Sequence, residues 1–91
     1  MKIGIIGSGD VGRVLGAGFI KEGHEVLLGT RDINKEAVVN WLANNPNSQV
    51  GSFADAAAFG ELIVLATAGD ITEAVIESAG IANFDSKIVI D

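Results

Sequence analysis

Several residue types that build common functional sites are missing or scarce in this chain. Its 91 residues include no cysteine and one histidine, so disulfide bonds and thiolate metal sites are excluded, and no metal site is expected. No apolar run reaches about 18 residues, the length that a membrane-spanning helix needs, and we expect no membrane segment. The N-terminus lacks the pattern of a signal or transit peptide, which makes the cytoplasm the expected location.

Positive charge is also scarce. Six Lys and Arg residues stand against twelve Asp and Glu residues, which gives a formal net charge of −6. Binding of nucleic acid depends on many contacts between basic side chains and phosphates, so this balance argues against a nucleic-acid partner. Apolar residues make up 48% of the sequence, which is enough for the core of one small domain. We therefore expect a single domain that spans residues 1–91.

The most informative feature is a glycine motif that follows an apolar, strand-like segment at residues 2–7 and opens a helical pattern at residues 10–21. The motif reads Gly7-Ser8-Gly9-Asp10-Val11-Gly12. A strand, G-x-G-x-x-G and a helix in this order are typical of dinucleotide binding, and we predict that these six residues form the cofactor-binding loop. Gly7 permits a sharp turn, Gly9 lets a pyrophosphate approach the backbone, and Gly12 lets the helix pack closely on the sheet. Free N–H groups at the start of the helix would face the phosphates.

The rest of the chain alternates between strand and helix patterns. Further strands are predicted at residues 25–30, 49–52, 62–67 and 87–91, and helices at residues 34–44, 52–60 and 70–80. Ser52 and Asp55 resemble a capping pair at the start of the second of these helices. This alternation predicts an α/β, Rossmann-like, doubly wound parallel sheet of about five strands in the order 3-2-1-4-5. Helical spacing places Val11, Val14, Leu15 and Phe19 on the buried side of the first helix, and Trp41 in the core.

The end of the second strand bears on which dinucleotide is bound. An acid there binds the adenosine ribose of NAD, whereas its absence and a nearby Arg suit the 2′-phosphate of NADP. Thr30 offers a hydroxyl, Arg31 can bind phosphate while stacking on adenine, and Lys35 can reach the same anion. The alternative uses Asp32, which would bind the ribose of NAD if the strand ran further. We favour NADP(H), with Asp32 as the N-cap of the following helix.

Other polar residues have more than one interpretation. We expect Asp10 to cap the first helix rather than to face the phosphates, whereas Arg13 either contacts phosphate or forms a surface ion pair. His24 lies in a turn without a nucleophilic partner, so we do not expect it to be catalytic. Thr67 either bonds the nicotinamide ribose or simply ends a strand. No catalytic residue is expected, because hydride transfer is the chemistry of the cofactor.

Three segments resemble a known family. Residues 7–13, Gly23-His24-Glu25-Val26 and Gly29-Thr30-Arg31-Asp32 resemble the NADP-binding domain of the deazaflavin (coenzyme F-420)-dependent NADP oxidoreductases. The cytosolic domain of the STEAP metalloreductases is similar in its Gly-Ser-Gly-Asp start. The resemblance extends over essentially all 91 residues and is sharpest at the first turn and at the end of the second strand.

This resemblance implies hydride transfer between NADPH and a deazaflavin or flavin-like acceptor. It assigns the pyrophosphate to Ser8 and to the backbone of residues 9–11. The residues that it assigns to the 2′-phosphate are Thr30, Arg31 and Lys35. The residues that it places beside the nicotinamide end are Ala66, Thr67 and Ala68.

The sequence stops on a predicted strand, and we expect it to be part of a longer protein. The region for substrate binding and dimerisation would then lie outside residues 1–91, and the isolated chain would bind cofactor with little or no hydride transfer. The alternatives are a non-catalytic NADP(H)-binding module and the cofactor domain of a sugar-nucleotide or hydroxyacid dehydrogenase or a pyrroline-carboxylate reductase relative. A methyltransferase would require an acid where Thr30 stands.

Overall fold

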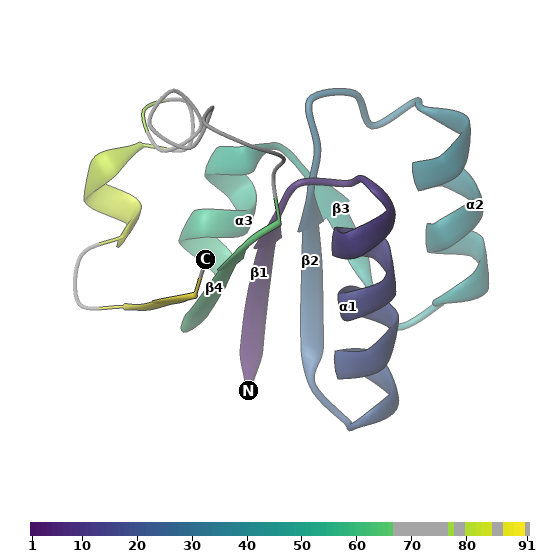
Figure 1. Cartoon of the computed structure of the whole chain (residues 1–91), viewed down its shortest axis with the longest axis horizontal. Helices are drawn as coiled ribbons and strands as arrows, with labels where there is room; N and C mark the ends of the chain where they lie inside the picture. The colour runs from purple at the N-terminus through teal and green to yellow at the C-terminus, as the bar shows by residue number, and fades with distance from the viewer. Residues whose placement is uncertain (67–76, 78–79, 85–86, 91) are drawn as a thin grey trace.

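The computed structural model describes residues 1–66, 77, 80–84 and 87–90, and within them five strands form one parallel sheet (Figure 1). The strands are β1 (Lys2–Ile6), β2 (Glu25–Gly29), β3 (Gln49–Gly51), β4 (Leu62–Leu65) and β5 (Ile88–Ile90). Their order is β3-β2-β1-β4-β5, and every neighbouring pair is parallel. The predicted fold class and strand order are therefore confirmed.

Helices cover both faces of the sheet. The helices α1 (Asp10–Lys21) and α2 (Glu36–Asn44) lie on one face, and α3 (Phe53–Phe59) lies on the other (Figure 1). A short 3-10 helix, η2 (Ile81–Phe84), precedes β5. Strands β2 and β3 lie on one side of β1, and β4 and β5 lie on the other. Because each crossover between parallel strands is right-handed, the helices that connect them divide between the two faces of the sheet. The carboxyl ends of β1, β2 and β4 consequently meet at one edge of the molecule, where ligands bind in such folds.

The core has two apolar layers separated by the sheet. On the side of α1 and α2, Ile3 and Ile5 of β1 pack with Val26, Leu28 and Trp41. On the other side, Ile6 packs with residues of α3, β2 and β4. Residues that alternate along β1 and β2 thus enter different layers, which explains why both strands read as continuous apolar runs.

The start of α3 follows the sequence prediction. The Asp55 N–H donates to the Ser52 hydroxyl at 3.0 Å, and the Ser52 N–H donates to the Asp55 carboxylate at 2.9 Å, so the two residues form a capping box. The helix then packs very closely on β1, because a Cβ placed on Gly4 would lie 2.0 Å from the carbonyl oxygen of Ala56. Gly4 is therefore required by the close approach of α3.

The buried face of α1 differs from the prediction. Val11, Val14 and Leu15 are 64%, 71% and 37% exposed, whereas the helix turns Gly12 and Gly16 toward the sheet. A Cβ on Gly16 would lie 2.8 Å from Cζ2 of Trp41, so the interface has room only for glycine. Assigning the largest apolar residues to the buried side was therefore wrong, except for Phe19, which packs partly buried against the core.

The segment before α2 also corrects the prediction. The helix begins at Glu36 rather than at residue 34, and its N-cap position is Lys35. Asp32 is not the N-cap. Its carboxylate accepts the N–H of Asn34 at 2.9 Å, which closes a local turn before the helix begins. The first four strands also end one or two residues earlier than predicted, because the ladder stops where the chain turns away from the sheet.

Most of the predicted helix at residues 70–80, together with Thr67 and Ala68, lies outside the described residues. None of the helices in the described part of the chain has the length and apolar character needed to cross a membrane. The same residues contain no cluster of His, Asp and Glu side chains that could hold a metal ion.

Candidate functional site

The turn after β1 joins the ends of two strands. Gly7 has a φ of 122°, a conformation that favours glycine, and its N–H donates to the carbonyl oxygen of Gly29 at 3.0 Å. The sharp turn predicted at Gly7 is therefore present. It places the glycine motif directly beside the end of β2, the position where the sequence predicts recognition of the adenosine ribose.

Gly9 leaves space beside the N-terminal end of α1 among the residues that the structure describes. Gly9 occupies the N-cap position, and the first helical hydrogen bond runs from the Arg13 N–H to the Gly9 carbonyl oxygen at 3.0 Å. The amides that precede this bond have no acceptor within the helix. A Cβ on Gly9 would meet no atom of the described residues within 4 Å. An anion could therefore approach these amides and the positive end of the helix dipole.

Gly12 brings the helix into contact with the turn. A Cβ on Gly12 would lie 2.1 Å from the carbonyl oxygen of Gly7 and 3.4 Å from Cβ of Ala66. The close packing expected at Gly12 is therefore confirmed. The Ala66 N–H donates to the Ile6 carbonyl oxygen at 2.8 Å, so the end of β4 lies against the same turn.

Asp10 and Arg13 form an ion pair in the first turn of α1. Asp10 is not the N-cap, because Gly9 holds that position, and its carboxylate instead accepts from Nη2 of Arg13 at 2.5 Å. Nε of Arg13 also donates to the Ser8 carbonyl oxygen at 3.1 Å. The surface ion pair, one of the two interpretations of Arg13, is therefore present in the structure.

Two hydroxyls connect the glycine motif to the end of β2. Oγ of Ser8 and Oγ1 of Thr30 share a hydrogen bond of 2.8 Å, and Thr30 is only 4% exposed. The N–H of Asp32 donates to the same Thr30 oxygen at 3.2 Å. Sequence analysis predicted both hydroxyls as cofactor ligands but not their contact, which depends on the two loops meeting at the edge of the sheet.

Arg31 and Lys35 are both exposed, and they contact different parts of the protein. The Arg31 guanidinium lies 5.6 Å from the centre of the Phe53 ring at the start of α3. Lys35 instead borders a cleft of about 610 Å³ between α1 and α2. This cleft is lined by Arg13, Lys35, Glu36, Ala37, Asn40, Trp41, Asn44 and Asn45. Lys35 and Arg13 thus line the same cleft, whereas Arg31 lies against Phe53.

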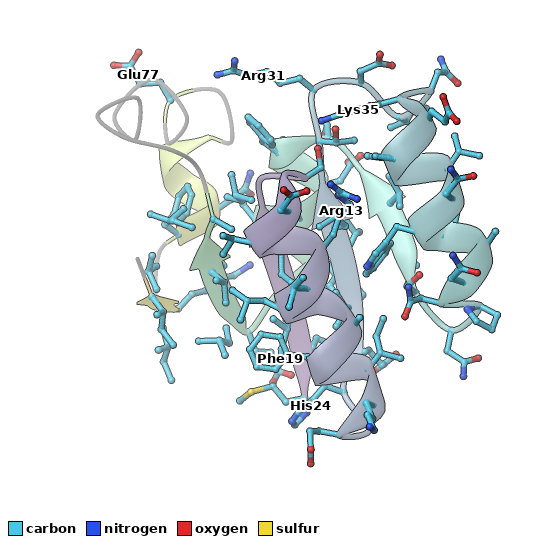
Figure 2. The ribbon with its side chains drawn as sticks, turned by 45° about the vertical axis from the view of Figure 1, so that its right-hand side comes forward. Arg13, Phe19, His24, Arg31, Lys35 and Glu77 are labelled. Carbon is cyan, nitrogen blue, oxygen red and sulfur yellow. The ribbon has the colours of Figure 1, made fainter. Side chains whose placement is uncertain are left out.

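Trp41 has a polar role that the sequence did not reveal. Its indole Nε1 donates to the Arg13 carbonyl oxygen at 2.8 Å and so links α2 to the first turn of α1. Its helical spacing indicated only a core residue. Figure 2 shows that Arg13, Arg31 and Lys35 lie at one end of the molecule, whereas His24 and Phe19 lie at the other. His24 is therefore remote from the glycine motif.

These features define an α/β domain with a glycine-rich turn of the dinucleotide-binding type. Residues 2–91 match the family model described as NADP oxidoreductase, coenzyme F420-dependent. The chain therefore belongs to the family of coenzyme F420-dependent NADP oxidoreductases. Comparison with curated protein sequences gave no match.

Solved structures share the fold. A protein from Arthrobacter sp. FB24, to which F420-dependent NADP reductase activity has been attributed, is 36% identical with a TM-score of 0.88, over 98% of this chain and 43% of its own. The N-terminal domain of HmdIII from Methanocaldococcus jannaschii is 26% identical with a TM-score of 0.68, over 87% of this chain and 53% of its own. An imine reductase from Streptomyces aurantiacus is 21% identical with a TM-score of 0.80, over 98% of this chain and 30% of its own. At this identity the similarity supports the fold alone. The chain thus spans less than half the length of the Arthrobacter protein.

Proposed function

We propose that this chain is the NADP(H)-binding domain of a reductase that transfers hydride between NADPH and a deazaflavin or flavin-like acceptor. The observation that carries the proposal is the N-terminal end of α1 beside the turn at Gly7, where no atom of the described residues would lie within 4 Å of a Cβ on Gly9. There, Gly9 leaves the first helical amides accessible and Gly12 fixes the helix against the strand. The family match over residues 2–91 supports the same function.

In this proposal the pyrophosphate lies against the backbone of residues 7–12. The N–H groups of the first turn of α1 bind its oxygens, and the helix dipole favours its charge. Ser8 lies at the edge of this position, and Thr30 holds the Ser8 side chain through their shared hydrogen bond. The dihydronicotinamide supplies the hydride, and the residues of this chain bind and orient the cofactor.

The residues at the end of β2 support NADP(H) over NAD(H). The Asp32 carboxylate, which would bind the ribose of NAD, is engaged by the Asn34 N–H. The end of β2 carries Thr30 in place of an acid, and the exposed cations Arg31 and Lys35 follow it. We propose that these two cations bind the 2′-phosphate, with the Arg31 guanidinium stacked on the adenine.

The proposal also covers the nicotinamide end of the site, the position of the electron acceptor and the location of the protein. Ala66, which lies against Gly12 at the end of β4, would border the nicotinamide end, and Thr67 and Ala68 beyond it belong to the same loop in sequence. We further propose that the electron acceptor binds outside residues 1–91 and that two copies pair there. The cytoplasm is the proposed location.

The proposed function is tested by titrating the unaltered chain and the variant Arg31→Ala with NADPH and with NADH. Trp41 is the only tryptophan of the chain and contacts α1, so its fluorescence can report titration with NADPH and NADH. We expect NADPH to bind more tightly. Arg31→Ala should weaken NADPH by about 1.5–3 kcal/mol, which is roughly 10- to 150-fold, because a charge-assisted hydrogen bond is lost. NADH affinity should fall by much less, because NADH can lose only the stacking of Arg31 on the adenine and has no 2′-phosphate.

Lys21→Ala provides the matched control, since Lys21 is an exposed cation in the last turn of α1, far from the glycine motif. This variant should bind both nucleotides like the unaltered chain. Tighter or equal binding of NADH by the unaltered chain would refute the assignment to NADP(H). An unchanged ratio of the two affinities in Arg31→Ala would refute the role of Arg31.

A further inference from the structure

The carboxylate of Asp10 lies at the end of α1 where, in the proposed function, the two phosphates of the cofactor's pyrophosphate bind. Asp10 is the first residue of α1, and its side chain is 95% exposed. A carboxylate at this position stabilises a helix by interacting with its dipole. The same negative charge would repel a pyrophosphate at the same helix end. The site therefore needs a way to balance the charge of Asp10 if it binds anionic cofactors.

Arg13 is placed to provide that balance. One turn along the helix, its Nη2 donates to the Asp10 carboxylate at 2.5 Å, while its Nε donates to the Ser8 carbonyl oxygen at 3.1 Å. The guanidinium thus contacts both the acid and the loop that would hold the phosphates. Its side chain is only 26% exposed, in contrast to that of its partner.

The position of Arg13 is fixed from a second element. Trp41 of α2 donates its Nε1 hydrogen to the Arg13 carbonyl oxygen at 2.8 Å, and both residues line the cleft between α1 and α2. An exposed ion pair by itself adds little to protein stability. The contacts of Arg13 with Ser8 and Asp10 therefore point to a role in the loop rather than in the stability of the fold.

We propose that Arg13 is a positioning residue of the phosphate-binding loop. Anchored on the Ser8 carbonyl oxygen, it neutralises the charge of Asp10, so that the end of α1 accepts the pyrophosphate of either nicotinamide dinucleotide. This inference rests on the proposed dinucleotide binding. It differs from the roles of Arg31 and Lys35, because the pyrophosphate is common to NADPH and NADH and the 2′-phosphate is not.

The size of the effect follows from the repulsion that Arg13 removes. Two unit charges about 6 Å apart repel with an energy that corresponds to roughly a 3-fold change in affinity in bulk water and roughly a 100-fold change at a dielectric constant of about 20, and for the exposed Asp10 we expect an intermediate value of roughly 10-fold. Arg13→Gln should therefore weaken NADPH and NADH equally, by roughly 10-fold, when each is titrated against Trp41 fluorescence. The difference from the unaltered chain should shrink at high salt, because salt screens the repulsion.

Two further variants decide whether charge is the cause. Asp10→Asn combined with Arg13→Gln removes both charges, and both affinities should return to within about 2-fold of the unaltered chain, since the repulsion is gone. Lys21→Gln removes the same single positive charge from the other end of α1 and should leave both affinities unchanged. Thermal unfolding of each variant checks that the domain remains folded.

Each other outcome overturns the inference. A loss in Arg13→Gln that Asp10→Asn does not restore would mean that the charge of Asp10 is not what Arg13 balances. A loss confined to NADPH would make Arg13 a ligand of the 2′-phosphate, and no loss would remove any role in binding.

If Arg13→Gln does not fold, Asp10→Asn alone carries the test. It should tighten both nucleotides several-fold by exposing the charge of Arg13, and unchanged affinities would refute the proposal. Failure of the unaltered chain to bind either nucleotide would instead refute the proposed function.

Discussion

Replacing Gly12 with alanine tests the close packing on which the glycine motif depends. The added Cβ would lie 2.1 Å from the Gly7 carbonyl oxygen and 3.1 Å from its carbonyl carbon, and both atoms belong to the backbone of the turn. A flexible side chain could move aside at little cost, but this backbone is held by the hydrogen bond from the Gly7 N–H to Gly29. The start of α1 must therefore shift away from β1.

The magnitude follows from two opposing effects. Overpacking of this kind costs about 1–3 kcal/mol and occasionally more, and a clash between backbone atoms belongs at the upper end of that range. Alanine in a helix gains about 1 kcal/mol over glycine. We expect Gly12→Ala to lower the free energy of unfolding by about 2 kcal/mol, a large part of the roughly 5–14 kcal/mol that a domain of this size has. Urea unfolding followed by Trp41 fluorescence measures the difference.

Gly18→Ala is the matched control on the same helix. A Cβ on Gly18 would meet no atom of the described residues within 4 Å, and Gly18 is exposed. This variant should gain up to about 1 kcal/mol from helix propensity alone. If Gly12→Ala were as stable as Gly18→Ala, the close contact between α1 and the turn would be wrong, and with it the geometry that opens the helix end.

Two further predictions concern hydroxyls. Thr30→Val keeps the shape of a side chain that is 4% exposed but removes its hydrogen bonds with Ser8 and with the Asp32 N–H, so urea unfolding should show a loss of about 1–3 kcal/mol. Thr30→Ser, which retains the hydroxyl, should lose less, and equal losses in the two variants would contradict this explanation. Ser52→Ala removes the N-cap of α3 and should cost about 1 kcal/mol in the same assay, whereas Ser52→Thr should be close to neutral. An unchanged stability of Ser52→Ala would show that the cap is not needed.

The sequence predicted the strand order and the turn at Gly7 because both depend on local patterns. Apolar runs, glycines and helix caps each specify the backbone within a few residues, and the right-handed crossover rule then limits the topology. The capping box of Ser52 and Asp55 was predictable for the same reason. These features need no knowledge of which side chains meet across the fold.

The buried face of α1 was not predictable in this way. Hydrophobic periodicity assigns the largest apolar side chains to the interface, and here the interface consists of Gly12 and Gly16 because Trp41 and the turn approach the helix backbone. The size of the residue that an interface accepts depends on its neighbour, which comes from another part of the chain. For the same reason the contact of Trp41 with Arg13 could not be read from the spacing in α2.

Asp32 was misassigned for a different reason. A carboxylate that accepts an N–H two residues later can either begin a helix or close an isolated turn, and the local hydrogen bond is the same in both cases. Only the continuation of the backbone beyond Asn34 decides, and here the helix begins later, at Glu36. The contact of Arg31 with Phe53 was not predictable either. Phe53 follows β3 in the sequence, and it lies near Arg31 only because β2 and β3 pair in the sheet.

The contrast between the two phosphate positions suggests how affinity and selectivity are divided in the proposed function. The end of α1 is made of backbone held by Gly7 and Gly12, with Arg13 bound to the Ser8 carbonyl oxygen, so in this proposal it is organised before any ligand binds and would serve both nucleotides. Arg31 rests over Phe53 and Lys35 borders a separate cleft, so the 2′-phosphate has to draw these exposed side chains together. Arg31→Ala should therefore change the NADPH-to-NADH ratio by the same factor with or without Arg13→Gln, because the two substitutions act on different phosphates and their free energies should add within about 0.5 kcal/mol. If Arg31→Ala lowered the NADPH-to-NADH affinity ratio only in the chain that retains Arg13, the two arginines would serve a single phosphate.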